Sequence, residues 1–160
     1  MIASRVIVDA DACPKSCLQI IRKLAAVYDF EVITVASFNH HIEHARHQVT
    51  GNEAQATDIA IINQVREGDI VVTQDWGLAA IALGKRAGAI APGGRIYQDD
   101  QMDMLLEERN ILAKFRRGGG RTRGPAKRTS DDDHRFEANL TGLLKTIIPG
   151  NQPVGEGHGD

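Results

Sequence analysis

The sequence predicts a three-layer α/β/α fold with a central, mostly parallel sheet. Short runs of apolar, often β-branched residues alternate along the chain with longer segments whose apolar residues recur at helical spacing. The strand runs are apolar throughout, which is typical of parallel strands that are buried on both faces. Strands that alternate with helices of this length form sheets with helices on both sides. The main strands are predicted at residues 5–9, 31–36, 70–74 and 87–91.

The first strand and the first helix meet in the stretch RVIVDADACP. The β-branched run at 6–8 favours a buried strand that ends at Asp9. Pro14 can open a helix at its first position, and the helix predicted at 14–28 has its apolar residues on one face. EVITVA at 31–36 is the second predicted strand.

The next part of the chain is less regular. Residues 37–50 predict a loop with a brief strand near 47–50. A helix is predicted at 54–66, and a Gly-Asp pair breaks it. The apolar run IVVT that follows predicts the buried strand at 70–74.

Two further strand and helix pairs complete the pattern. A helix is predicted at 76–86 and a short strand at 87–91, followed by the Pro-Gly-Gly turn at 92–94. Residues 95–97 favour an edge strand, and residues 102–115 favour a helix.

With 160 residues, the chain is long enough for one substantial core, and we expect a single domain at 1–148. Residues 114–128 contain seven Lys or Arg, several Gly and no acid, which predicts a flexible basic loop. Ser130 is the predicted N-cap of a last helix at 132–147. Residues 149–160 have little to bury and predict a disordered tail.

Composition narrows the class of protein. The net charge is -2, so any binding to nucleic acid requires a local basic patch. Cys13 and Cys17 have a spacing that suits neither a disulfide nor a zinc pair, which favours reduced thiols and a cytoplasmic location. No run approaches the ~20 apolar residues of a membrane span, so we expect no membrane partner.

Two aspartates follow the first strand. Asp9 and Asp11 lie at its predicted carboxyl end, where ligands bind in open α/β sheets. Carboxylates this close repel each other unless a proton or a cation neutralises them. We therefore favour a site for a hard divalent cation, which prefers oxygen ligands. The alternative is that one of them only caps the following helix.

Two more aspartates fit the same pattern. Asp75 follows the strand at 70–74, so it meets Asp9 and Asp11 if the two strands are neighbours. Asp58 lies near the start of the helix at 54–66, and its carboxylate can reach the same edge. The alternatives are an N-cap for Asp75 and a helix-dipole contact for Asp58.

Four segments resemble the uncharacterised bacterial YaiI/YqxD family: VDADACP, ATDIAI, GDIVVTQDWGLAA and RTRGPAKRTSDDDHRF. The resemblance covers residues 5–147, and the family is grouped with PIN-like domains, so it implies a PIN-like fold. PIN nucleases hold Mg²⁺ or Mn²⁺ with a few acidic residues and hydrolyse phosphodiesters, mostly in RNA. The resemblance thus implies a metal-dependent ribonuclease in which Asp9, Asp58 and Asp75 match the acids of PIN domains, while Asp11 is an addition of the YaiI/YqxD family. We expect all four aspartates to be catalytic and metal-binding residues.

One departure concerns the glutamate that PIN domains carry between the first two acids. Glu43 and Glu53 are the candidates here, but neither matches a motif. PIN domains also often have a small hydroxyl residue before the last acid, and Thr73 matches that residue.

A polyanion needs a cationic track beside such an acidic site. The basic loop can supply it, although a charge run can also be a solvated surface. Aromatic residues near the site are few, so base stacking is not predicted. The expected substrate contacts are Asn39, Thr73, Lys114, Arg116, Arg117, Arg121, Arg123, Lys127 and Arg128.

Other interpretations stay open. A protein that binds metal and nucleic acid without turnover is one. Another is a phosphatase of the haloacid dehalogenase type, whose DxDx(T/V) start VDADAC imitates with Cys13 in the last position. The histidines of HHIEHARH favour a surface or substrate-contacting cluster over a zinc site.

Overall fold

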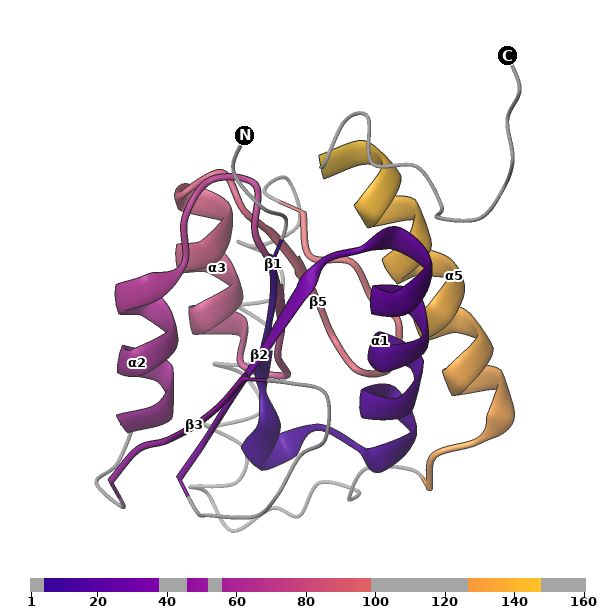
Figure 1. Cartoon of the computed structure of the whole chain (residues 1–160), viewed down its shortest axis with the longest axis horizontal. Coiled ribbons are helices and arrows are strands. Elements are labelled where there is room, and N and C mark those ends of the chain that lie inside the picture. Colours follow the sequence, from indigo (N-terminus) through magenta and orange to yellow (C-terminus); the bar gives the residue numbers. More distant parts are fainter. Residues whose placement is uncertain (1–4, 38–45, 52–55, 99–126, 148–160) are drawn as a thin grey trace, which may run out of the picture.

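The computed structural model describes residues 5–37, 46–51, 56–98 and 127–147. Within these ranges one parallel sheet has the strand order β3-β2-β1-β4-β5 (Figure 1). The strands are β1 (Arg5–Asp9), β2 (Glu31–Ala36), β3 (Arg46–Val49), β4 (Ile70–Val72) and β5 (Gly88–Ile90). The helices are η1 (Ala10–Ala12), α1 (Lys15–Tyr28), α2 (Ala56–Gln64), α3 (Trp76–Gly84) and α5 (Ser130–Ile147).

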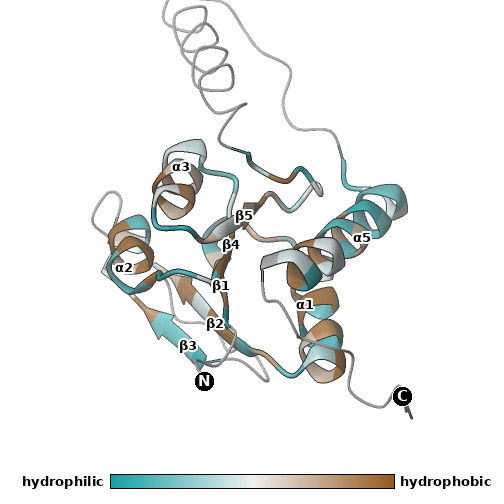
Figure 2. Cartoon of the chain, turned by 90° about the horizontal axis from the view of Figure 1, so that it is seen from above, coloured by the Kyte–Doolittle hydropathy of each residue, from teal (hydrophilic) through white to brown (hydrophobic). Residues whose placement is uncertain are grey.

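The helices cover the sheet on both faces. Helices α1 and α5 lie on one face, and α2 and α3 lie on the other (Figures 1 and 2). The predicted three-layer α/β/α architecture is therefore confirmed. None of the described helices is both long and apolar enough to cross a membrane.

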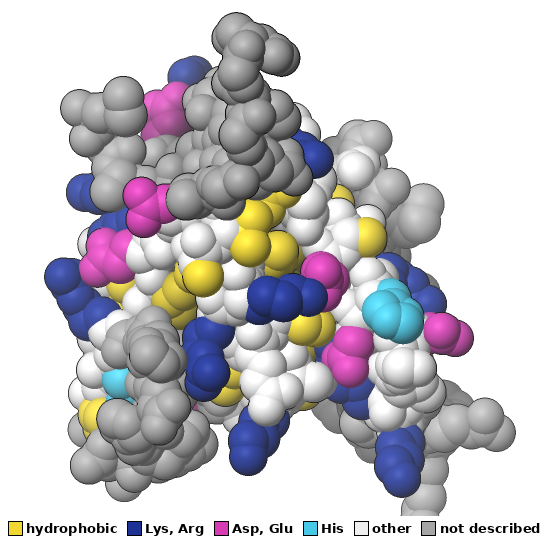
Figure 3. All heavy atoms as spheres, turned by 45° about the vertical axis from the view of Figure 1, so that its right-hand side comes forward, with side chains coloured by type: hydrophobic (Ala, Val, Ile, Leu, Met, Phe, Trp, Pro, Cys, Tyr) yellow, Lys and Arg dark blue, Asp and Glu magenta, His cyan; other side chains and the backbone are white. Residues whose placement is uncertain are grey.

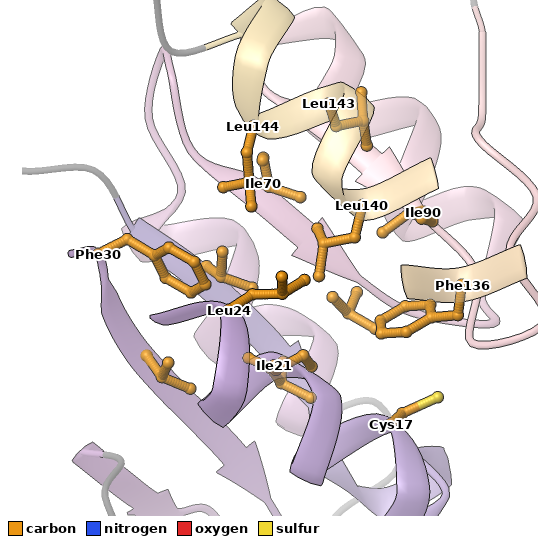
Figure 4. Close-up of a cluster of buried hydrophobic side chains, with 14 of the residues drawn as sticks. Cys17, Ile21, Leu24, Phe30, Ile70, Ile90, Phe136, Leu140, Leu143 and Leu144 are labelled. Carbon is orange, nitrogen blue, oxygen red and sulfur yellow. The ribbon is translucent and has the colours of Figure 1, made fainter. Parts of the chain in front are cut away.

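Alternate residues of β1 pack into the two halves of the core, one on each face of the sheet. Val6 and Val8 pack toward α1 and α5, while Ile7 between them packs toward α2 and α3, and all three are fully buried. Figure 4 shows Leu144 of α5 beside Ile70 of β4, and Leu140 of α5 between Leu24 of α1 and Ile90 of β5. The last helix thus packs on the same core as the strands, as expected from the sequence.

Several local boundaries differ from the sequence prediction. Pro14 is the N-cap of α1 and not its first residue, so Cys13 precedes the helix. Ser130 is already helical, because the hydroxyl of Thr129 and the carboxylate of Asp132 form the reciprocal bonds of a capping box. The expected edge strand at 95–97 reduces to a single antiparallel bridge from Ile96 to Ile90.

The amino ends of β1 and β4 are joined by a buried ion pair. The guanidinium of Arg5 donates to both carboxylate oxygens of Asp69, at 2.6 and 3.1 Å, and also to the carbonyl of Gln64. Both partners are buried, whereas the sequence pattern indicated Asp69 only as part of a helix break. The helix predicted at 102–115 and the tail at 149–160 lie outside the described residues.

Candidate functional site

The candidate site lies at the carboxyl ends of β1 and β4, the lower edge of the sheet in Figure 1. The order of the strands reverses here, since β2 follows β1 on one side and β4 flanks it on the other. Such a switch point is where open α/β sheets bind ligands. Asp9 ends β1, Asp11 lies in η1, Asp75 precedes α3, and Asp58 lies in the first turn of α2.

Thr73 joins the two strands at this edge. Its Oγ1 donates to Oδ2 of Asp9 at 3.1 Å and accepts from the backbone N–H of Asp75 at 3.0 Å. The hydroxyl of Tyr97 donates to the Thr73 carbonyl at 3.2 Å. Thr73 is fully buried, so its hydroxyl acts within the protein and positions Asp9 and Asp75.

Asp11 joins the ends of three elements. Its Oδ1 accepts from the backbone N–H of Ser37 at 2.9 Å and from the Ser37 hydroxyl at 3.1 Å. Its Oδ2 accepts from the hydroxyl of Thr57 at 2.9 Å. Neither Asp9 nor Asp11 caps α1, because the cap residue Pro14 receives no side-chain cap and η1 intervenes. The capping alternative for these two aspartates is therefore wrong.

For Asp75 the capping alternative is confirmed, but the cap is not the only interaction of its carboxylate. Oδ1 of Asp75 accepts from the backbone N–H of Leu78 at 3.1 Å, which caps α3. Asp75 also interacts with Asp58, whose pKa is raised by the charge of Asp75 and by a side-chain hydrogen bond between the two groups.

Burial and mutual repulsion raise the pKa of two carboxyl groups at this edge. Burial raises the pKa of Asp58 to about 6, helped by the charge of Asp75 and by the bond between the two groups. The charges of Asp9 and Asp11 raise it further. Burial also raises the pKa of Asp9, in part offset by its bond from Thr73, and the charges of Asp11 and Asp75 add to the rise. The structure thus brings the predicted aspartates into one electrostatic cluster.

The donor set suits a hard cation, but the side chains do not converge on one point. Four carboxylates are the ligand type that Mg²⁺ and Mn²⁺ prefer. Among the described residues, however, no group of three or more His, Cys, Asp or Glu is placed to hold a metal ion. Hydrogen bonds instead direct carboxylate oxygens toward Thr73, Ser37, Thr57 and Leu78. A cation held by several of these aspartates would therefore require their side chains to turn.

Two residues of the predicted basic loop are described. Lys127 is exposed. The Nε of Arg128 donates to Asp133 at 2.7 Å and to Ser16 at 2.9 Å, and Nη1 donates to the Pro92 carbonyl at 2.7 Å. Arg128 thus joins α1, the turn after β5 and the start of α5. The other predicted contacts lie outside the described residues: Asn39, Lys114, Arg116, Arg117, Arg121 and Arg123.

Sequence reasoning missed the residues that hold the carboxylates. Thr57 directly precedes Asp58, so its proximity to the cluster could have been suspected. Ser37 and Tyr97 carried no signal, because their contacts depend on the strand order. Of the histidine cluster only His47 is described, on β3, where Nδ1 lies 2.7 Å from the hydroxyl of Thr34. Glu43 and Glu53 lie outside the described residues.

Comparison with known proteins identifies relatives over almost the same residues. The chain is 49% identical over 141 residues to a UPF0178 protein of Heliobacterium modesticaldum, covering 88% of this chain and 97% of the relative. It is 45% identical over 142 residues to a UPF0178 protein of Clostridium tetani, covering 88% and 96%. No solved structure matches. Residues 7–146 match the family described as "Uncharacterized BCR, YaiI/YqxD family", and with these relatives the match shows that the chain belongs to the YaiI/YqxD family.

Proposed function

We propose that this protein is a phosphodiesterase that depends on Mg²⁺ or Mn²⁺ and cleaves nucleic acid, RNA in the first place. The observation that carries the proposal is the cluster of Asp9, Asp11, Asp58 and Asp75 at the switch point between β1 and β4. Helix capping needs one carboxylate per helix, whereas this edge gathers carboxylates, and burial together with their mutual charge raises the pKa of two of them.

The four aspartates would hold the cation, which when bound stabilises charge on phosphoryl oxygens and supplies a hydroxide near neutral pH. Thr73 keeps Asp9 and Asp75 beside each other through its hydroxyl. Asp11 stays anchored by Ser37 and Thr57. Asp58, with a pKa of about 6 when no cation is bound, is largely ionised at neutral pH, as a ligand must be.

A second candidate is a protein that binds metal and nucleic acid without turnover. The observation that favours it is that both carboxylate oxygens of Asp11 are hydrogen-bonded within the protein, which leaves three aspartates to hold a cation and one carboxylate fewer for the chemistry of turnover. Such a residue is more easily kept as a structural support than as a metal ligand.

The proposal is tested by incubating the pure protein with labelled RNA and DNA, with and without Mn²⁺. Asp9→Asn should abolish cleavage, because it removes a ligand without changing the shape of the side chain. Asp131→Asn makes the same change at an exposed position of α5 and should cleave like the wild type.

Two further measurements separate the candidates. Calorimetry should show Mn²⁺ binding that Asp9→Asn weakens strongly, and equal affinity in both proteins would refute the metal site. Mn²⁺ binding with no cleavage of any oligonucleotide would favour the second candidate. Release of phosphate from p-nitrophenyl phosphate would instead indicate the phosphatase.

A further inference from the structure

A cavity of about 810 Å³ opens beside the aspartate cluster. Its described lining comes from three places: the segment between β4 and α3, the segment after β5, and one face of α5. The polar and aromatic side chains of this lining include Gln74, Trp76, Arg95, Tyr97, Arg135 and Asn139. Gln74 and Trp76 flank Asp75 in the chain, so the lining of the cavity reaches to within one residue of the aspartate cluster.

The far wall of the cavity is the turn at 92–94, and α5 holds it in place. Asn139 donates to the Gly94 carbonyl at 2.6 Å, and Arg135 donates to the Gly93 carbonyl at 3.4 Å. Gly94 has a φ of 101°, and a Cβ there would lie 2.6 Å from Cγ of Arg135. Only glycine allows this close approach, so the wall is built before any ligand arrives.

The near wall connects the cavity to the aspartates. Tyr97 lines the cavity, is buried, and donates its hydroxyl to the carbonyl of Thr73. Thr73 in turn holds Asp9 and the backbone of Asp75. The cavity and the candidate site therefore share one rigid boundary.

The charge of the cavity is opposite to that of the aspartate cluster. Its described lining includes Arg95 and Arg135 but no acidic residue. Arg95 is exposed, and the side chain of Arg135 is 55% exposed although it also contacts Asp132. By contrast, Figure 3 shows charges of both signs mixed on the surface that carries α1 and α5, where Lys23 pairs with Glu137. The cavity thus favours an anionic ligand.

An aromatic face beside two arginines matches the parts of a nucleotide. Trp76 is half-buried, with part of the side chain packed on the core and part lining the cavity. Bases stack on such a side chain whatever their identity, and guanidinium groups bind the phosphates between them. Amide side chains such as Gln74 add hydrogen-bonding capacity.

We propose that this cavity binds a segment of single-stranded nucleic acid, with one base stacked on Trp76 and adjoining phosphates on Arg95 and Arg135. This inference names the ligand of the proposed nuclease. It rests on the proposed function for the claim that the bound strand is then cleaved. The strand would leave the cavity past Asp75, which places a phosphodiester beside the aspartate cluster.

Trp76 provides the first readout, because it is the single tryptophan of the chain. An unlabelled RNA oligonucleotide, added with a chelator so that no cleavage occurs, should quench its fluorescence. Uridine monophosphate is the second ligand and should bind much more weakly than the oligonucleotide. Equal affinity for both would mean a site for free nucleotides and would overturn the proposal.

Variants are compared by the fluorescence anisotropy of a labelled oligonucleotide. Trp76→Leu keeps an apolar side chain on the core but removes the stacking face, so the Kd should rise roughly tenfold to a hundredfold. Trp76→Tyr restores an aromatic face and should bind close to wild type, which separates stacking from a folding defect. Arg95→Gln with Arg135→Gln should also weaken binding, and the slope of log Kd against log salt should fall by about 0.7 for each phosphate that is no longer neutralised. Lys145→Gln, an exposed position of α5 outside the cavity, is the matched control and should change neither value.

The outcomes distinguish this inference from the proposed function. If the cavity variants bind like the control while the wild type cleaves RNA with Mn²⁺, the cavity inference is overturned and the nuclease stands. If the cavity variants lose binding but no metal supports cleavage, the inference stands and the nuclease fails. If the wild type binds no single-stranded RNA or DNA at low salt, the cavity inference is overturned.

Discussion

Replacing Asp58 with asparagine should stabilise the protein at neutral pH. The side chain keeps its shape and loses the charge that burial and the neighbouring carboxylates oppose. Its pKa of about 6 lies well above the ordinary value of 3.8. At about 1.4 kcal/mol per pKa unit the penalty would be about 3 kcal/mol in a sheltered site. Because Asp58 is partly exposed, solvent screening reduces this to about 1–2 kcal/mol.

The size of this stabilisation should depend on pH. Below a pH of about 4, Asp58 is protonated in the folded and the unfolded chain, and no penalty exists. Between about 4 and 6 the folded state keeps a proton that the unfolded chain releases, so the stability of the wild type falls as the pH rises. Above about 6 the penalty is complete. The advantage of Asp58→Asn over the wild type should therefore grow from near zero in acid to its full size at neutral pH.

Urea unfolding at several pH values measures this difference, with Asp131→Asn as the control for loss of an exposed carboxylate. Adding Mn²⁺ at about a hundred times its Kd should stabilise the wild type by about 2.7 kcal/mol. Asp58→Asn should gain less, since one ligand is missing. Equal stability of Asp58→Asn and wild type at neutral pH would refute the repulsion on which the proposed site depends.

Three further changes test the scaffold by urea unfolding. Thr73→Val removes the hydroxyl that joins β1 to β4 and should cost about 1–3 kcal/mol while weakening Mn²⁺ binding; Thr73→Ser should keep both. Arg5→Met leaves the carboxylate of Asp69 buried without its partner and should cost about 3–5 kcal/mol, much of which a second change of Asp69→Leu should recover. Gly94→Ala should cost about 1–3 kcal/mol through its positive φ and its contact with α5, whereas Gly93→Ala has open space and should be close to neutral.

The layers of the fold could be predicted because the central strands have a clear sequence pattern. VIV in β1 and IVV in β4 are apolar at every position, as strands buried on both faces must be. The strand order could not be read in the same way, since it depends on how separate segments pack. The meeting of Asp9 with Asp75 required β1 and β4 to be neighbours, which only the structure shows.

The parts of the site that escaped prediction all depend on contacts between distant residues. Thr57 reaches Asp11 across 46 positions of the chain, and Tyr97 reaches Thr73 across 24. Local rules performed better at the ends of helices, where they identified the cap at Asp75. They missed the cap of α5 by one residue, because Thr129 and Ser130 are both good cap residues and only the bonds of Thr129 decide between them.

Buried charge is balanced at one end of the strand pair β1 and β4 but not at the other end. At the amino ends of β1 and β4, Arg5 and Asp69 neutralise each other through two hydrogen bonds. At the carboxyl ends, the charges that shift the pKa of Asp9 and Asp58 are those of other aspartates. A fold selected only for stability gains nothing from this excess of negative charge, because each ionised carboxylate opposes the next. The excess is useful when a ligand supplies positive charge, and by the same reasoning the adjoining cavity, with its two arginines, suits the anionic partner.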